Sequence, residues 1–188
     1  MSKMKLESIE PPYFYILVGS TDEFGKYAYR LNYEKGYQFA VRVVRGHKMK
    51  RLESLFNELA AALQFPDYFG ENWAALEDCL FDLEWLRAEG YVLMIPRAAN
   101  ILCDDHPEER AVFIRTLLRT CKYWATAHMA FPSRELKLAP FHVLFHATES
   151  EVELVRQFLS PESPDTPIIP LSEIPDPASD ISTMERRA

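Results

Sequence analysis

The middle of the chain alternates short apolar runs with longer segments of helical spacing. Three runs, at 38–44, 91–95 and 141–145, have the length and composition of strands. Two helical segments separate the first run from the second, and one separates the second from the third. Connections of that length join parallel strands, so this order predicts a small parallel sheet packed against helices. The predicted fold class is therefore α/β.

The helices are placed by their periodicity and their end signals. Leucine and phenylalanine recur at helical spacing over 52–63, and Pro66 ends that helix because proline cannot continue it. Asn72 is a favoured N-cap and predicts a second helix from the next residue. Pro107, followed by two glutamates, opens a long third helix, and 149–159 has the periodicity of a short closing one.

The two ends of the chain differ from this middle part. The segment 13–19 predicts a strand that ends at a glycine, and the weaker alternation at 27–33 predicts a second one. After residue 160 the chain carries six prolines, which predicts an extended or disordered tail. The isoleucines and leucine within 168–171 are the residues expected to lie against the domain. We therefore expect an N-terminal extension with one or two strands (1–36), one domain (37–159) and a proline-rich tail (160–188).

Composition limits the class of protein and its partners. With 188 residues, 48% of them hydrophobic and 26% charged, the chain is long enough for one soluble domain with a substantial core. No apolar run approaches the length that spans a bilayer, and the first residues lack the apolar core of a signal peptide. We expect a cytoplasmic protein that does not contact a membrane. Its net charge of −7 argues against nucleic acid as a direct ligand.

Charge is distributed unevenly along the chain. The segment 67–89 contains seven acidic residues and one basic residue, whereas 42–51 contains five basic residues and no acidic one. This pattern predicts a dipolar molecule with an acidic pole.

The segment FPDYFGENWAALEDCL, residues 65–80, lies within the acidic part. Placing the residues after Asn72 at 100° intervals gives an apolar side and an acidic outer side that also carries a phenylalanine. An ordinary amphipathic helix explains the acidic residues. A surface for a basic partner explains both the acidic residues and the aromatic ones. The outer side comprises Ala74, Glu77, Asp78, Phe81 and Asp82.

The sequence does not predict an enzyme, a cofactor or a metal site. His142 and His146 share a strand face but lie about 13 Å apart at the rise of a strand, too far to share one ion. The cluster Asp104, Asp105 and His106 precedes a helix and is expected to cap it. The three cysteines, Cys79, Cys103 and Cys121, include no CxxC pair, which predicts reduced thiols. An enzyme that uses these histidines is the least favoured hypothesis.

The segment LQFPDYFGENWAALEDCL resembles the signature of the barstar family, small intracellular inhibitors of secreted ribonucleases of the barnase type. The family pattern is a helix, a turn of the form Pro-acid-Tyr-aromatic-Gly-Glu-Asn, and a second helix that ends in Asp-Cys-Leu. The predicted elements from about residue 38 to 148 also resemble the barstar fold. The resemblance implies that 37–159 is a barstar-like domain.

In that family the turn and the second helix block the active site of the ribonuclease, and acidic side chains take the positions of substrate phosphates. Asp78 matches the principal phosphate-mimicking acid, and Tyr68 matches an aromatic contact. The implied partner is a basic nuclease, either a ribonuclease or a related toxin, bound 1:1 as by an immunity protein or antitoxin. The expected partner-binding residues are Tyr68, Phe69, Gly70, Asn72, Ala74, Glu77, Asp78 and Phe81.

Two positions depart from the family pattern. Ala74 replaces a second acid, and Glu77 replaces an exposed tryptophan. The later helix carries Arg115, Arg119 and Lys122 along its polar side, where the family has a further acid. An alternative hypothesis is therefore a protein-interaction module that has the barstar fold and does not inhibit a ribonuclease.

Overall fold

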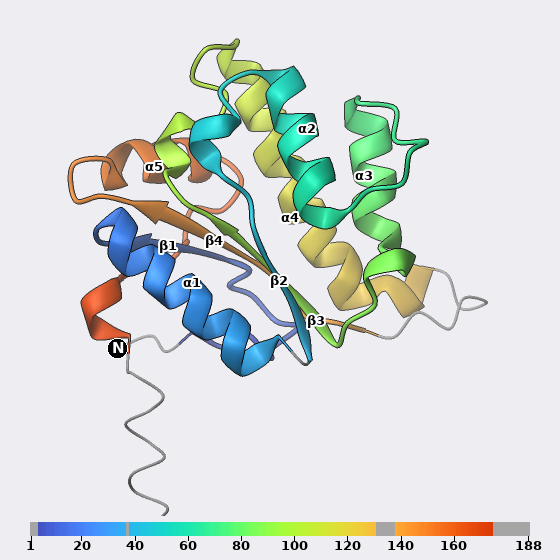
Figure 1. The fold of residues 1–188 in the computed structure, drawn as a ribbon, viewed down its shortest axis with the longest axis horizontal. Helices are drawn as coiled ribbons and strands as arrows, with labels where there is room; N and C mark the ends of the chain where they lie inside the picture. The colour runs from blue at the N-terminus through green and yellow to red at the C-terminus, as the bar shows by residue number, and fades with distance from the viewer. Residues whose placement is uncertain (1–3, 37, 131–137, 175–188) are drawn as a thin grey trace, which may run out of the picture.

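In the computed structural model, residues 4–36, 38–130 and 138–174 are described, and they form one five-stranded sheet with helices packed against it (Figure 1). All four pairs of neighbouring strands are parallel, and the strand order is β2-β3-β4-β1-β5. The strands are β1 (Phe14–Val18), β2 (Phe39–Val43), β3 (Gly90–Ile95), β4 (Phe141–Ala147) and β5 (Ile168–Pro170). The α/β class and the parallel sheet predicted from the sequence are confirmed.

Helices occupy the predicted segments of the middle of the chain. The helices are α1 (Thr21–Lys35), α2 (Leu52–Leu63), α3 (Trp73–Asp82), α4 (Pro107–Ala130) and α5 (Val152–Leu159). Short 3₁₀ turns lie at Gly46–Lys48, Glu84–Leu86, Ala98–Asn100 and Leu171–Glu173. No helix in the described ranges is long and apolar enough to cross a membrane.

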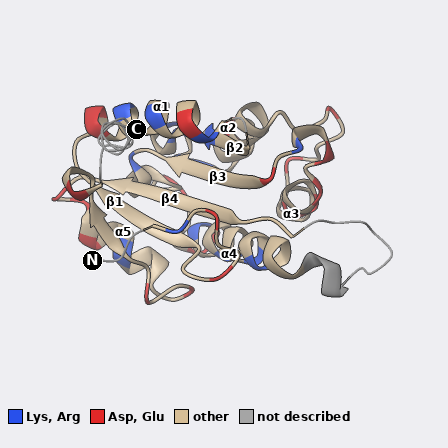
Figure 2. Cartoon of the chain, turned by 90° about the horizontal axis from the view of Figure 1, so that it is seen from below, with Lys and Arg blue, Asp and Glu red and all other residues tan. Residues whose placement is uncertain are grey.

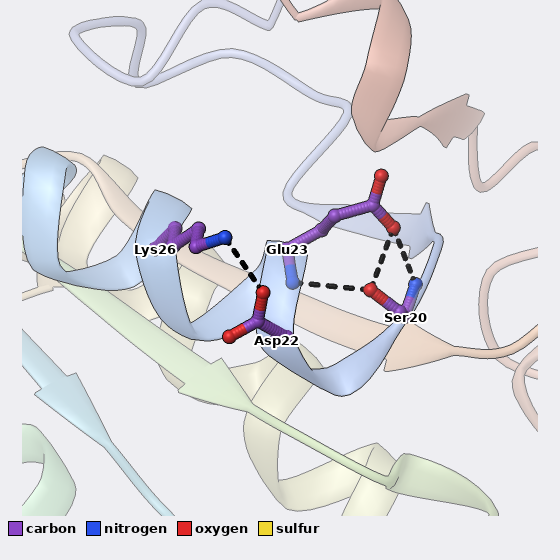
Figure 3. Close-up of polar contacts among 4 residues, drawn as sticks. All are labelled: Ser20, Asp22, Glu23 and Lys26. Carbon is purple, nitrogen blue, oxygen red and sulfur yellow. Dashed lines mark hydrogen bonds and ion pairs between the residues drawn. The ribbon is translucent and has the colours of Figure 1, made fainter.

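The strand predicted at 27–33 is wrong, because this segment lies within α1. Its buried residues Phe24, Tyr27, Ala28 and Leu31 follow helical spacing, which outweighs the weak alternation. Ser20 and Glu23 form a capping box at the start of α1 (Figure 3). The Glu23 amide donates to the Ser20 Oγ at 3.2 Å, and the Ser20 amide donates to the Glu23 carboxylate at 2.7 Å. This Ser-x-x-Glu signature is readable in the sequence and marks a helix start.

The two faces of the sheet are covered by different helices. Figure 2 shows α1 above the sheet and α4 and α5 below it. Alternate residues of each strand enter the two cores, as in β1, where Phe14 and Ile16 face one side and Tyr15 and Leu17 face the other. The first core also contains the buried sides of α2, α3, α4 and α5, and the second contains α1.

The ends of the chain take part in this sheet. β1 pairs with β4 on one side and with β5 on the other. Ile168 and Ile169 stand opposite Ile16 and Leu17, and Leu171 is buried beside α1. The expected tail therefore adds a strand to the sheet at 168–170, whereas residues 175–188 lie outside the described part of the chain.

His142 and His146 lie on the α1 side of β4, and both are fully buried. His146 Nδ1 accepts the Arg97 amide at 3.1 Å, and its Nε2 lies 3.0 Å from the Gly19 carbonyl oxygen. Because Nδ1 is an acceptor, the proton of the neutral ring is on Nε2 and is donated to Gly19. His142 Nε2 lies 2.9 Å from the Ser8 carbonyl oxygen. Burial lowers the pKa of both rings.

We expect the free energy of unfolding to decrease as the pH falls from 7.5 to 5.5. Above the unfolded pKa of about 6.5 both histidines are neutral in either state, and below it the unfolded chain binds protons that the folded chain does not. The expected loss is about 1 kcal/mol for each group. Urea unfolding at several pH values measures this slope.

The variant His146→Gln should flatten the pH dependence, whatever it does to stability at pH 7.5. His106→Gln is the control because His106 is exposed. A slope that is the same in His146→Gln and in the unmodified protein would contradict this account.

Candidate functional site

Hydrogen bonds fix the backbone at both ends of the loop between α2 and α3. Gln64 ends α2 in the left-handed conformation, with φ of 56°, and its amide donates to the Ala60 carbonyl. Asn72 begins α3, and its side-chain oxygen accepts the Ala75 amide at 3.0 Å. The Asn72 Nδ2 donates to the Gly70 carbonyl at 2.9 Å. The predicted N-cap at Asn72 is confirmed, and Asn72 also holds the preceding turn.

A cluster of aromatic side chains anchors this loop to the core. The Phe69 ring lies 4.9 Å from the Phe65 ring and 6.0 Å from the Phe56 ring, measured between centroids. Phe56 also contacts Trp73 at 5.2 Å, and Phe65 contacts Trp85 at 6.1 Å. Phe69, expected as a partner contact, therefore points inward and holds the loop in place.

Tyr68 points in the opposite direction. Its side chain is 72% exposed, which is unusual for a large aromatic residue in a rigid loop. Partial desolvation raises the pKa of the Tyr68 hydroxyl, and the nearby Cys79 thiol and the carboxylates of Asp82 and Glu84 add to this effect. The Tyr68 ring is thus close to the end of α3, where the carboxylates of Asp82 and Glu84 lie.

The outer side of α3 carries two further expected site residues. Ala74 and Asp78 are both exposed and lie one helical turn apart. Asp78 makes no ion pair with any residue in the described ranges. Gly70 is exposed at the start of the same surface. We call Tyr68, Gly70, Ala74 and Asp78 the outer face.

Glu77 and Phe81 lie between α3 and α4 instead of on the outer face. The Arg119 Nε of α4 lies 3.0 Å from a Glu77 carboxylate oxygen, and the Glu77 side chain is 21% exposed. The Phe81 ring stacks on the Tyr123 ring, with centroids 4.1 Å apart and an angle of 2° between the planes. The helical wheel assigned both residues to the outer side because it does not show where α4 packs.

Acidic side chains surround the outer face. Figure 2 shows Asp and Glu gathered on α3 and on the loop that precedes it. Asp67, Glu71 and Glu84 are exposed there. Glu71 has a positive φ of 46°, which an L-residue adopts when the surrounding turn requires it. The acidic pole predicted from the sequence therefore includes the loop and the exposed side of α3.

The residues considered for catalysis do not converge. His106 is exposed and lies 3.6 Å from a Glu108 oxygen, whereas Asp105 accepts the amide of Leu52 at 2.5 Å. Asp105 thus caps the first turn of α2, and not the helix that follows it in sequence. In the described part of the chain, no group of three or more His, Cys, Asp or Glu side chains is arranged to hold a metal ion.

The comparison with protein families agrees with this geometry. The family described as Barstar (barnase inhibitor) matches residues 39–145, which is more than half of the chain. The chain belongs to the barstar family. No curated protein matches it in a sequence search.

The part that matches the barstar family extends from β2 into β4 and contains α2, α3, α4 and the whole outer face. The elements β1, α1, α5 and β5 lie outside the match. The ion pair of Arg119 with Glu77 is not predicted by the sequence of this barstar-family chain. The basic residues along α4 are visible in the sequence, but residue spacing does not show whether they point towards α3.

Phe69→Ala and Tyr68→Ala should have opposite consequences. Removing the Phe69 ring leaves a gap in the aromatic cluster and should lower the free energy of unfolding by about 2–3 kcal/mol. Removing the exposed Tyr68 ring should change it by no more than about 0.5 kcal/mol. Urea unfolding of both variants gives the comparison. Equal losses of stability would contradict the inward position of Phe69.

Proposed function

We propose that the protein inhibits a barnase-like ribonuclease, or a related basic toxin nuclease, by covering its active site with the outer face. The observation that carries this proposal is Asp78, which is exposed on α3 and makes no ion pair within the described residues, while the loop before α3 exposes the ring of Tyr68. The complex is 1:1, and the protein acts in the cytoplasm as an immunity protein or antitoxin.

The chemistry of a ribonuclease site supports Asp78 as the central contact. Such a site binds phosphates with arginine, lysine and histidine, and a carboxylate fixed on a helix can take the place of a phosphate. Glu77 is less available because Arg119 already compensates its charge. Ala74 leaves room beside Asp78 without adding charge. The function thus depends on one main anion, supported by Tyr68.

The rigidity of the loop lowers the cost of binding. Asn72 holds the turn and caps α3, and Phe69 anchors the loop from below. A surface that is already ordered loses little conformational entropy when it meets a partner. The exposed acidic residues around it also attract a basic protein from a distance, which raises the rate of association at low salt.

The three cysteines support a reducing compartment. Cys79, Cys103 and Cys121 are all unpaired, and Cys79 and Cys121 are buried. Burial raises the pKa of the Cys121 thiol well above its ordinary value, so this thiol is unreactive. Free buried thiols are typical of proteins that remain inside the cell.

The alternative function is a barstar-fold interaction module that does not inhibit a ribonuclease. Arg119 favours it, because its ion pair with Glu77 leaves one carboxylate fewer for a basic active site. A partner of mixed charge depends less on free carboxylates than a ribonuclease site does. Binding experiments with nucleases separate the two functions.

Asp78→Asn should weaken binding to the nuclease by at least about 30-fold, because a central contact of this kind contributes 2 kcal/mol or more. The ligands to test are a purified barnase-type ribonuclease and any nuclease encoded in the neighbouring reading frame. Glu34→Gln on α1 is the matched control, since it removes one exposed carboxylate far from the outer face. Affinity is measured by calorimetry, and inhibition by RNA cleavage. If the Asp78→Asn variant inhibits RNA cleavage as strongly as the unmodified protein, the proposal is disproved.

Arg119→Ala should speed association with a basic nuclease by a few-fold, because it releases the Glu77 carboxylate and adds net negative charge to the site. The increase should disappear at high salt, where charge attraction is screened. Stopped-flow mixing at two salt concentrations measures it, with Arg156→Ala on α5 as the control. A tenfold loss of affinity would show instead that Arg119 contacts the nuclease and would contradict this account of its charge.

A further inference from the structure

The β2 strand forms an edge of the sheet. It pairs with β3 on one side, and no strand from the described ranges pairs with its other side. The strand is five residues long and contains no proline or glycine. Many natural edge strands are shortened, bent or covered, because an open edge can pair with another chain. β2 is uninterrupted, and its last residue, Val43, is 44% exposed, whereas Phe39 and Val41 are buried.

The direction of the β2 backbone shows which groups are open. The Val44 amide donates to the Met94 carbonyl at 2.9 Å, so this residue faces β3. Because directions alternate along a strand, the N–H and C=O groups of Phe39, Val41 and Val43 face away from β3. Among the described residues, the one partner found for these outward groups is the Arg42 guanidinium, which donates to the Val41 carbonyl at 3.0 Å.

A hollow lies on each face of this edge. On the α1 face, a groove of about 570 Å³ is lined by Tyr29, Val41 and Val43. Tyr29 is 78% exposed and Val43 is 44% exposed, so the groove presents apolar surface to solvent. On the opposite face, a hollow of about 410 Å³ is lined by Arg42 and Arg87. An added strand would direct alternate side chains into these two hollows.

The charges at the edge select the kind of strand that fits. Arg42 and Arg87 make no ion pair with any residue that the structure describes, and Glu89 is the one acidic residue lining their hollow. A second copy of the chain would bring another Arg42 and Arg87 to the same edge, where like charges repel. A strand with acidic side chains on that face would pair with both guanidinium groups.

We propose that the free edge of β2 binds an extended segment of a partner protein in which apolar and acidic residues alternate. The segment adds a sixth strand to the sheet. Its main chain bonds to Phe39, Val41 and Val43, its apolar side chains enter the groove beside Tyr29, and its acidic side chains meet Arg42 and Arg87.

Arg42 closes this edge when no partner is bound. Its guanidinium covers the Val41 carbonyl, which is one of the acceptors that a new strand needs. A carboxylate from the partner offers the guanidinium a stronger, charged acceptor. Arg42 can then leave the Val41 carbonyl to the incoming backbone. Segments without acidic residues cannot make this exchange, so Arg42 contributes to specificity.

This surface does not depend on the proposed nuclease site. It consists of β2, α1 and the segment 86–89, whereas the outer face consists of α3 and the loop before it. Asp78→Asn should therefore leave the binding of the segment unchanged.

The test uses the full chain and a fluorescein-labelled peptide of seven residues in which valine and glutamate alternate, with blocked ends. Fluorescence anisotropy should show binding that weakens about tenfold or more when lysine replaces glutamate, because charge-assisted hydrogen bonds are lost. Arg87→Glu should have a similar effect, and Arg156→Glu on α5 should have none. Equal binding of the two peptides would overturn the proposal.

A backbone variant tests strand addition itself. Val43→Pro removes an N–H that faces away from β3, so the β2–β3 ladder remains intact. Peptide binding should fall about tenfold, whereas Val43→Thr, which keeps the N–H, should bind normally. A peptide with N-methyl groups on its edge-facing residues should also bind weakly, which gives the same information if Val43→Pro does not fold. Binding that survives both changes would exclude strand addition.

Amide hydrogen exchange gives the most specific result. The peptide should protect the amides of Phe39, Val41 and Val43, whereas Ala40 and Arg42 already bond to β3 and should change little. Absence of this alternation would overturn the proposal. The same alternation without peptide, increasing with protein concentration, would show that a second copy occupies the edge and would also overturn it.

Discussion

The central strands of this protein are buried on both faces, and the rest of the structure depends on that constraint. All seven residues of β4 are buried, and they alternate between the two cores. A parallel sheet of this kind needs cover on each face, since neither face can be left in water. The helices α2 to α5 contribute to the core on one side, and α1 covers the other. β1 and α1 are thus structurally necessary, although they lie outside the part that matches the barstar family.

The two sides of α3 have different surroundings. Its inner side packs against the core through Leu76, Cys79 and Leu80. Its contact with α4 is reinforced by the Trp124 indole, which donates to the Leu80 carbonyl at 2.9 Å, and by the Arg119–Glu77 ion pair. These contacts hold α3 against the core and α4, so its remaining side, with Ala74 and Asp78, has a fixed orientation. A rigid scaffold of this kind can position one carboxylate for a partner.

The uneven charge of the chain leads to two surfaces of opposite charge. The outer face lies among acidic side chains, whereas the guanidinium groups of Arg42 and Arg87 line one hollow at the edge of the sheet. Arg87 is the one basic residue in the acidic segment 67–89, yet in the fold it lies beside Arg42. Position in the sequence therefore does not tell which pole a charged residue joins.

Local signals in the sequence determined most of the middle part. Helical periodicity located α2, α3 and α4, the Asn72 N-cap placed the start of α3, and the apolar runs located β2, β3 and β4. These features depend on contacts between residues close in the sequence, so residue spacing and capping residues are enough to predict them. The barstar-family motif in turn indicated the loop and Asp78 as the candidate site.

Tertiary packing decided what local signals could not. Asp105 was expected to cap the helix after it, but it caps α2, which lies beside it in space. Glu77, Phe81 and Phe69 were expected on the binding surface, but α4 and the aromatic cluster engage them. A helical wheel gives the direction of a side chain from its own axis, and only the packing of neighbouring helices determines whether that direction leads to solvent or to another side chain.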